Sequence, residues 1–192
     1  MKEREADGQI RYARAPCVTV RRATIADLER IMEIEVTAYS APWHTQTMRS
    51  ELEADPERKV YLVAEVDGWM AGYIGSHVFA GEVHIATVAV APRYQRMGLG
   101  ELLVLTMLAY AVEHGCDYVT LEYRISNRAA EQLYQKVGFI PVRVRTSYYI
   151  DNGEDAIVAE ITNIRGSRYR KKLERLIERW GLRHEYDVHV II

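Results

Sequence analysis

Apolar side chains recur at every second position in several stretches of the first half of the chain. This alternation is typical of strands that bury one face. Asp67-Gly68 is a strong signal for a hairpin, and Gly72 and Gly75 are typical of bends or bulges in the strand that follows. These signals predict antiparallel strands at residues 18–22, 60–66, 69–80 and 82–90.

A different spacing, with apolar residues three and four positions apart, predicts two helices between the first two strands. Thr24, with Asp27 three residues later, is typical of a capping box at the start of the first helix. Glu35 falls on the apolar stripe of that helix, so we expect it either in solvent or at a cleft. Thr45 is expected to cap the second, shorter helix, which runs to Asp55-Pro56.

Residues 88–100 combine a β-branched strand with a glycine-containing loop, and the helix predicted at 101–114 follows directly. In that order, the free N–H groups at the start of the helix point into the loop. A helix N-terminus carries about half a positive charge and binds phosphate groups well. Gly98 and Gly100 lack a Cβ, so a ligand can approach the main chain there. The stretch therefore predicts a phosphate cradle.

Two familiar phosphate loops are excluded by the residues present. A Walker loop needs Gly-Lys-Ser/Thr, which is absent, and the dinucleotide fingerprint needs a third glycine where Leu103 stands. The remaining pattern is Gln95-x-x-Gly98-x-Gly100. Taken alone, this pattern is also compatible with an ordinary strand-to-helix turn.

The second half of the chain predicts a strand, a helix and a final hairpin. Asn127 caps the helix and Gly138 ends it. The hairpin turns at Asp151-Asn152-Gly153. The expected elements are a strand at 117–125, a helix at 128–137 and hairpin strands at 139–150 and 156–161.

Residues 163–192 add an amphipathic helix that is basic on one side. Its apolar side includes Tyr169, Leu173, Leu176 and Trp180. Two interpretations stay open for the basic side: it is solvated, or it contacts an acidic surface such as ribosomal RNA. Residues 188–192 are expected to form a short edge strand.

Composition describes an ordinary globular protein, since 48% of the 192 residues are hydrophobic and 27% are charged. A net charge of -2 argues against non-specific nucleic-acid binding, and the longest apolar run is too short to span a membrane. The charged first residues do not form a secretory signal. Cys17 and Cys116 lack metal-ligand spacing, so we expect a cytoplasmic protein without a metal. The domain limits expected are a flexible leader at 1–16, a domain at 17–162 and an extension at 163–192.

The motifs together resemble the GNAT superfamily of N-acetyltransferases, and within it the RimI-like subfamily. The glycine loop is similar to the acyl-CoA pyrophosphate loop of these enzymes. Further similarity comes from Leu121 to Ala130 and from the pairs that follow it. The additional matching stretches are Leu133-Tyr134, Gly138-Phe139, Tyr148-Tyr149 with Gly153 to Ala156, and Ala41-Pro42-Trp43. The resemblance covers roughly residues 18–161.

This resemblance implies an α/β fold with a mixed, mostly antiparallel sheet that is flanked by helices and splayed around acetyl-CoA. One departure from the family pattern is Glu101, an acidic residue where the family often has a basic one near phosphate. The residues implied to bind the cofactor are Val88, Ala89, Val90, Gln95, Arg96, Met97, Gly98, Leu99, Gly100, Glu101 and Asn127.

The same resemblance implies that Glu122 is the general base and that Tyr134 donates a proton to the departing CoA thiolate. Taken alone, Glu122 would pair with Arg124 or face water, and Tyr134 would be a core residue. Trp43, Tyr148 and Tyr149 are implied to line the peptide site. The alternative for Trp43 is that it fastens the helix pair to the core.

The implied substrate is the N-terminal α-amino group of a protein, with a ribosomal protein as the candidate target. Such an amine has a pKa of about 7.7–8.0, against about 10.4 for lysine, so it is partly neutral near pH 7.5. Two alternatives stay open: acetylation of lysine or a small amine, and a non-catalytic adaptor that binds acyl-CoA. Cys116 follows a helix C-terminus, where the dipole does not favour a thiolate, so we interpret it as a packing residue.

Overall fold

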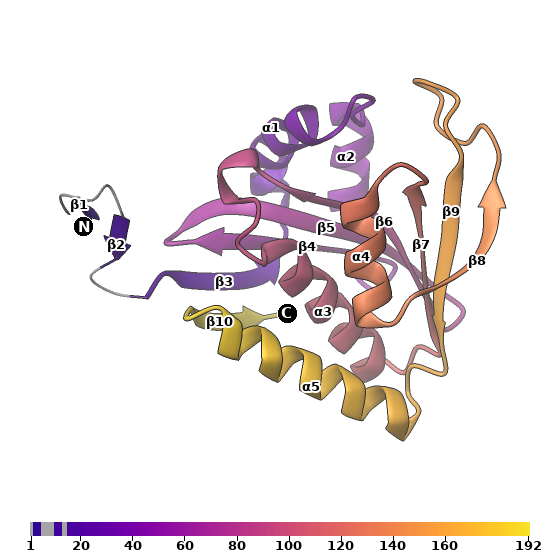
Figure 1. The fold of residues 1–192 in the computed structure, drawn as a ribbon. Coiled ribbons are helices and arrows are strands. Elements are labelled where there is room, and N and C mark those ends of the chain that lie inside the picture. The colour runs from indigo at the N-terminus through magenta and orange to yellow at the C-terminus, as the bar shows by residue number, and fades with distance from the viewer. Residues whose placement is uncertain (1, 5–9, 13–14) are drawn as a thin grey trace.

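The computed structural model describes residues 2–4, 10–12 and 15–192 and shows an eight-stranded sheet in the order β10-β3-β4-β5-β6-β7-β9-β8 (Figure 1). Only two neighbouring pairs are parallel, β10–β3 and β6–β7. A separate two-stranded pair joins β1 (Lys2–Arg4) to β2 (Ile10–Tyr12). The strands of the large sheet are β3 (Cys17–Arg22), β4 (Lys59–Val66), β5 (Trp69–Phe79), β6 (Glu82–Val90), β7 (Tyr118–Arg124), β8 (Ile140–Arg145), β9 (Ala156–Thr162) and β10 (Asp187–Ile191).

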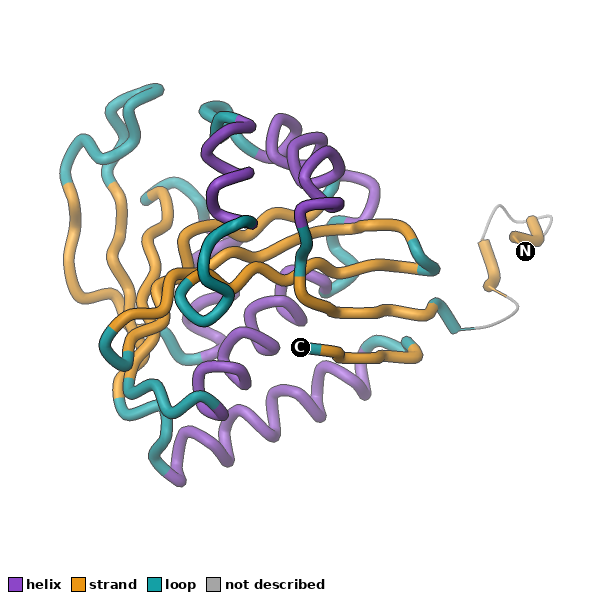
Figure 2. The backbone as a smooth tube through the Cα atoms, turned by 180° about the vertical axis from the view of Figure 1, so that it is seen from behind, coloured by secondary structure: helices purple, strands orange, loops and turns teal. Residues whose placement is uncertain are grey.

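Helices cover both faces of this sheet (Figures 1 and 2). One core cluster packs α1 and α2 against β4 and β5. The other packs the remaining helices against the opposite face. In the described part of the chain, no helix has the length and apolar character needed to cross a membrane. The helices are α1 (Leu28–Ala38), α2 (Thr45–Leu52), α3 (Leu99–Glu113), α4 (Arg128–Val137) and α5 (Ser167–Arg183), with 3-10 turns η1 (Ile25–Asp27) and η2 (Pro92–Tyr94).

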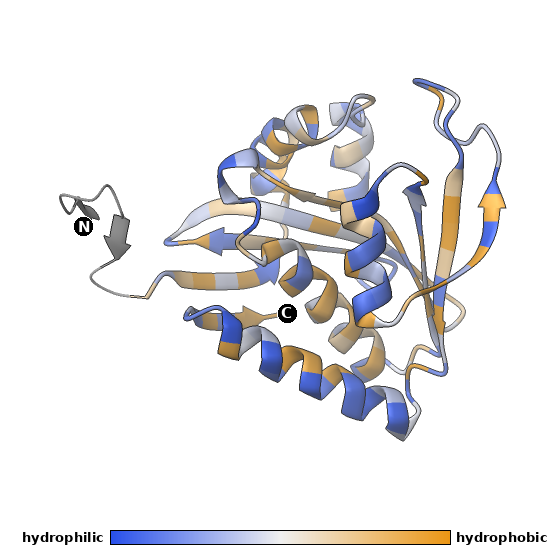
Figure 3. Ribbon diagram, viewed as in Figure 1, coloured by the Kyte–Doolittle hydropathy of each residue, from blue (hydrophilic) through white to orange (hydrophobic). Residues whose placement is uncertain are grey.

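Helix α3 is apolar on nearly all sides because it lies between the sheet and α5 (Figure 3). Leu173, Leu176 and Trp180 on α5 are buried in the same cluster as α3. The basic residues of α5 lie on its other side and are exposed. The predicted edge strand is confirmed, since β10 pairs with β3 at the border of the sheet.

Strands β6 and β7 pair for only part of their length, and this shapes the site. Their parallel pairing runs from Glu82 with Tyr118 to Ile85 with Leu121, and then stops. Residues 86–90 and 122–124 continue as strands without pairing to each other. We call the space between these two unpaired ends the split. A bulge in β6, where Ala86 has no partner on β5, lies just where the strands part.

Most predicted boundaries are confirmed, including the capping box of Thr24 and Asp27 and the bulge beside Gly75. A Cβ on Gly75 would stand 2.2 Å from the Tyr61 ring, which explains a glycine there. The cap predicted at Thr45 is wrong, because His44 is the N-cap and Thr45 is the first helical residue. Half of the predicted leader, residues 1–16, lies outside the described residues.

One further prediction needs correction. Tyr148 and Tyr149 do not lie on a hairpin strand, because β8 ends at Arg145 and β9 begins at Ala156. Both residues lie in the connecting loop, where their rings pack edge to face with centres 5.2 Å apart. The alternation of side chains along a strand therefore does not apply to them. At the β3–β10 pairing, the possible ligand atoms of Cys17, Asp187 and His189 lie within 4.8 Å of one another. This grouping does not contradict the expectation of a protein without a metal.

Candidate active site

The wall of the split formed by β6 presents main-chain groups. The Ala91 N–H donates to the Ala71 carbonyl on β5, whereas the main-chain groups of Val88 and Val90 find partners elsewhere. Tyr39 bonds both groups of Val88: its hydroxyl donates to the carbonyl at 2.7 Å and accepts from the N–H at 3.2 Å. The Gln95 amide donates to the Val90 carbonyl at 3.2 Å. The predicted acyl-CoA strand therefore has polar main-chain groups that no neighbouring strand satisfies.

The loop after β6 turns the chain so that α3 begins at the split. Gly98 is the N-cap of α3 and has φ +77°, and Arg96 also has a left-handed φ of +65°. A Cβ on Gly98 would meet the His184 ring at 2.4 Å, so the protein itself fills the space beside this glycine. The missing Cβ of Gly98 thus makes room for His184, and the approach of a ligand to the main chain at Gly98 stays a prediction. At Gly100 the nearest atom is a Val90 methyl at 3.7 Å, so the space beside that residue is less filled.

Glu101 does not add an unbalanced negative charge to this loop. Its side chain is nearly buried, and its two oxygens accept from Lys136 Nζ and Arg183 Nη2, each at 2.8 Å. Two cations thus neutralise the carboxylate. The acidic departure from the family pattern is compensated by one residue on α4 and one on α5.

β7 and α4 carry the two side chains predicted to take part in the reaction, Glu122 and Tyr134. Glu122 on β7 is 8% exposed, and its oxygens lie 3.2 Å from Arg145 Nη2 and 3.4 Å from His84 Nε2. The simple alternative, pairing with Arg124, is wrong. Arg124 instead pairs with Asp151 and Glu154. A carboxylate has about four lone-pair positions, so these two neighbours leave Glu122 with room for a further donor.

Tyr134 lies on the buried side of α4 and packs against two aromatic rings, Tyr123 at 5.5 Å and Phe139 at 5.6 Å. Burial raises the pKa of Tyr134 well above its usual value, so the phenol keeps its proton at neutral pH. In the described part of the chain its hydroxyl makes no hydrogen bond. Asn127 caps the same helix by accepting from the Ala130 N–H at 3.0 Å.

Trp43 packs on the core cluster of α1 and α2, and its main-chain N–H donates to Glu35 at 3.0 Å. This contact supports the structural role for Trp43, which is half-buried, and its role in lining the peptide site stays a prediction. Glu35 is only 1% exposed, so the expectation of a solvated residue is wrong. It also accepts a hydrogen bond from the Tyr73 hydroxyl.

The loop that carries Tyr148 and Tyr149 is tied to the end of β7. The Arg124 guanidinium lies 3.8 Å from the centre of the Tyr149 ring and also pairs with Asp151 at 2.9 Å. Ser40, in the loop between α1 and α2, donates a hydrogen bond to Asp151. The two loops predicted to hold the peptide are therefore in contact with each other.

Sequence reasoning missed several polar residues at this site. Tyr39 and Tyr73 come from separate elements and meet at Thr87, with oxygen distances of 3.1 Å and 3.3 Å to its hydroxyl. Arg145, which pairs with Glu122, was also missed. The one available signal of buried polar residues here was Glu35, a carboxylate on an otherwise apolar stripe, which accepts a hydrogen bond from Tyr73. Tyrosine is a common core residue, so the aromatic partners gave no such signal.

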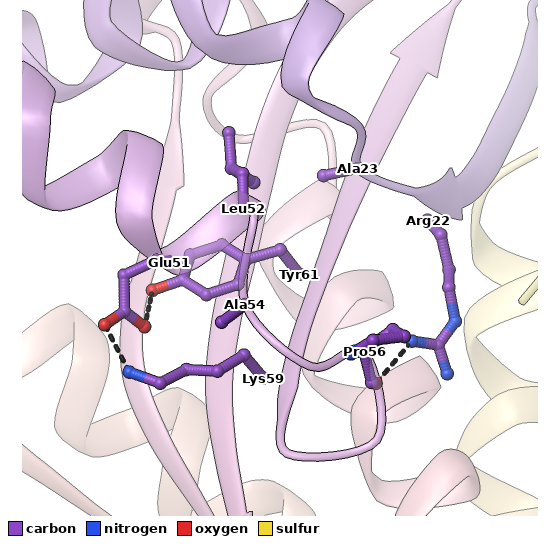
Figure 4. Close-up of a pocket in the computed structure, with 8 residues that line it drawn as sticks. All are labelled: Arg22, Ala23, Glu51, Leu52, Ala54, Pro56, Lys59 and Tyr61. Carbon is purple, nitrogen blue, oxygen red and sulfur yellow. Dashed lines mark hydrogen bonds and ion pairs between the residues drawn. The ribbon is translucent and has the colours of Figure 1, made fainter.

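Two hollows accompany these elements. One, of about 380 Å³, has Glu122, His84 and Arg145 among its lining residues, so it adjoins one of the two predicted catalytic residues. The other, of about 50 Å³, lies between α2 and β4 and is occupied in part by ion pairs of its own (Figure 4). There Glu51 binds Lys59 and accepts from the Tyr61 hydroxyl at 3.0 Å. None of the predicted site residues lines the smaller hollow.

Comparison with known proteins agrees with this geometry. The sequence profile of the acetyltransferase (GNAT) family matches residues 28–139. The [ribosomal protein bS18]-alanine N-acetyltransferase of Escherichia coli (strain K12) is 33% identical over 142 residues, which cover 73% of this chain and 94% of that protein. An N-alpha-acetyltransferase of Sulfurisphaera tokodaii is 34% identical over 154 residues, covering 71% of this chain and 88% of that protein.

Solved structures give the same result. The crystal structure of the ribosomal-protein-S18-alanine N-acetyltransferase from Escherichia coli matches with a TM-score of 0.71 and 32% identity, over 76% of this chain and 94% of that one. A mixed sheet that parts between two parallel strands, with a helix N-terminus at the parting, defines an acyl-CoA-dependent transferase. The chain belongs to the GNAT family of acetyltransferases and is RimI-like within it. Acetyl-CoA is accordingly its cosubstrate.

Proposed function

We propose that this enzyme transfers the acetyl group of acetyl-CoA to the N-terminal α-amino group of a protein, with a ribosomal protein as the target. The observation that carries the proposal is the split itself, where main-chain groups of Val88 and Val90 have no partner on a neighbouring strand. Glu122 on β7 and the protonated phenol of Tyr134 on α4 are the proposed base and acid. The names of the relatives support the choice of amine, since both refer to α-amino acetylation or to an alanine of a ribosomal protein.

In this proposal the main chain holds the cosubstrate. The N–H groups of residues 96–101 bind the diphosphate at the start of α3, where the helix dipole favours negative charge. The main-chain groups of Val88 and Val90 that no neighbouring strand pairs bind the pantetheine arm and the acyl carbonyl. A main-chain N–H at this position also stabilises the negative charge that develops on the acyl oxygen. For Val88, the Tyr39 hydroxyl now makes these hydrogen bonds and gives way to the ligand.

The side chains move the protons. Glu122 accepts a proton from the amine, directly or through a water molecule, as the nitrogen attacks the acyl carbon. Tyr134 donates its proton to the departing thiolate. General acid–base catalysis of this kind contributes about 10²–10⁴-fold to the rate. An N-terminal amine suits this arrangement because it is already partly neutral near pH 7.5, whereas a lysine amine is almost fully protonated.

Product analysis tests the choice of amine. The protein is incubated with acetyl-CoA and a peptide that starts with alanine and contains an internal lysine, and the acetylated position is located by mass spectrometry. We expect acetylation of the N-terminal amine. Acetylation of the lysine alone would overturn the proposal in favour of a lysine acetyltransferase. Binding of CoA without any product would favour the non-catalytic adaptor.

A further inference from the structure

The C-terminal segment makes direct contacts with the loop proposed to bind the diphosphate. The indole N–H of Trp180 donates to the Gly98 carbonyl at 2.9 Å. The Tyr186 hydroxyl donates to the Met97 carbonyl at 3.3 Å. His184 contacts both rings, stacked on Tyr186 and tilted against Trp180, and the centres of the Trp180 and Tyr186 rings are 5.8 Å apart. These three residues lie beyond residues 28–139, the part of the chain that the family profile matches.

Holding these carbonyls also orients the N–H groups. A peptide unit is planar and trans, so its C=O and N–H point in opposite directions. When Trp180 fixes the Gly98 carbonyl, the Leu99 N–H is fixed in the opposite direction. The Met97 carbonyl and the Gly98 N–H belong to one peptide unit, so the bond from Tyr186 to this carbonyl likewise fixes the direction of the Gly98 N–H. Both N–H groups belong to the predicted phosphate cradle and precede the first hydrogen-bonded turn of α3, where N–H groups have no partner within the helix.

His184 completes this support by filling space. Its ring stands where a Cβ of Gly98 would be, and its Nε2 is buried without a hydrogen-bond partner among the described residues. Burial, followed by the nearby charge of Arg183, lowers the pKa of His184, so the ring stays neutral at pH 7 and packs as an aromatic group. Arg183 holds one oxygen of Glu101 in the first turn of the same helix. Four contacts from residues 180–186 thus support this loop and the first turn of α3.

We propose that Trp180, His184 and Tyr186 are positioning residues for acyl-CoA, which hold the diphosphate loop in its binding shape from outside the family domain. The inference rests on the proposed function, because it takes the loop to be the diphosphate site. Since the contacts stay away from Glu122 and Tyr134, they affect cosubstrate affinity and leave the acetyl-transfer step unchanged.

The chain offers a closely matched control. Tyr169 also lies on α5, and its hydroxyl also donates to a main-chain carbonyl, that of Val137, at 3.0 Å. Tyr169→Phe therefore removes the same kind of hydrogen bond from the same helix, away from the loop. Tyr186→Phe makes the identical chemical change next to the loop, and Trp180→Phe removes the stronger bond.

The experiment measures CoA binding by titration calorimetry, together with KM for acetyl-CoA and kcat, in the full-length protein. We expect Trp180→Phe to raise the Kd for CoA about threefold to tenfold, as the loss of one hydrogen bond implies. Tyr186→Phe should raise it about twofold to threefold, since its bond is longer. The KM for acetyl-CoA should rise in parallel, while kcat stays within about twofold of the wild-type value. Tyr169→Phe should bind CoA like the wild type.

Three results would overturn the inference. Wild-type affinity in both loop variants would show that the loop keeps its shape without these bonds. An equal loss of affinity in Tyr169→Phe would show that α5 acts only through general stability. A wild-type protein that does not bind CoA would remove the proposed function itself, which distinguishes that failure from the other two. Tyr186→Phe keeps the test decisive if Trp180→Phe does not fold.

Discussion

In the proposed function, the two sides of the split contribute to binding and reaction in different ways. The wall of β6 and α3 presents N–H and C=O groups, which every residue except proline carries in the same form. The side of β7 and α4 carries the carboxylate of Glu122 and the phenol of Tyr134, groups that the main chain lacks and that, apart from the carboxylate of aspartate, no other side chain provides. The first wall therefore depends on the shape of the backbone, and the second depends on the identity of two side chains. Substitutions that change only one of these properties separate the two walls.

The largest effect is expected from a change of identity on the β7 wall. Glu122→Gln keeps the size of the side chain but removes its ability to accept a proton. We expect kcat/KM to fall by about 10²–10⁴-fold, measured as initial rates of peptide acetylation. Glu160→Gln is the matched control, because Glu160 lines the same 380 Å³ hollow from β9. Equal activities of these two variants would contradict the proposed base.

The second change of identity, Tyr134→Phe, removes the proposed acid and keeps the ring. We expect kcat to fall by about 10- to 100-fold, at the low end for general acid catalysis because a thiolate leaves more easily than an alkoxide. Burial raises the pKa of Tyr134, so the wild-type rate should not decline through loss of this proton between pH 7 and 9.5. Tyr123→Phe, on the neighbouring ring, serves as the control and should retain its activity.

A change of backbone shape should affect the other wall. Gly98→Ala places a Cβ in the left-handed region and against the His184 ring. We expect at least a roughly tenfold loss of CoA affinity and about 1–3 kcal/mol of stability, measured by calorimetry and thermal unfolding. Gly68→Ala, at φ +80° with no atom within 4 Å of its Cβ, bears the backbone strain without the clash. It should bind CoA normally, and equal effects of the two variants would argue against a special shape at Gly98.

The smallest effect concerns the loop above the β7 wall and its response to acid. Hydrogen bonds from Ser126, followed by those from Asn152 and Arg124, lower the pKa of Glu154 to about 2. A carboxylate whose pKa is lower in the folded state stabilises the protein above its unfolded pKa and loses this contribution as pH falls toward 2. Glu154→Gln should therefore flatten the change in Tm between pH 5 and 2.5. The exposed Glu57→Gln control should keep the wild-type slope.

Elements whose signals are local could be predicted from the sequence. The capping box at Thr24, the Asp67-Gly68 hairpin and the Asn127 cap depend on neighbouring residues only, and all three are confirmed. The alternation in residues 82–90 likewise predicted β6. The prediction that Tyr148 and Tyr149 lie on a hairpin strand was wrong. Aromatic residues are common in strands, but they also occur in loops, and the sequence pattern did not distinguish the two.

Contacts between distant residues were beyond the reach of the sequence. The amphipathic pattern of α5 showed that one side is buried, but it did not show that Trp180 meets Gly98, 82 residues away. The sequence placed an acidic residue, Glu101, next to the predicted phosphate site, but it did not show that Lys136 and Arg183 neutralise its charge. The site residues themselves came from family motifs, and their roles stay predictions until the variants above are measured.

The bulge at Ala86 limits how this protein can be recombined with its relatives. Val83 and Ile85 point to the helix layer of α3, and beyond the extra residue Val88 and Val90 point to that layer again, while Ala89 turns to the opposite core. Side-chain direction alternates strictly along a regular strand. In a chimera that received this strand without its extra residue, the side chains of Val88, Ala89 and Val90 would therefore point to the opposite faces of the sheet. The length of β6 is therefore as much a part of the site as any of its side chains.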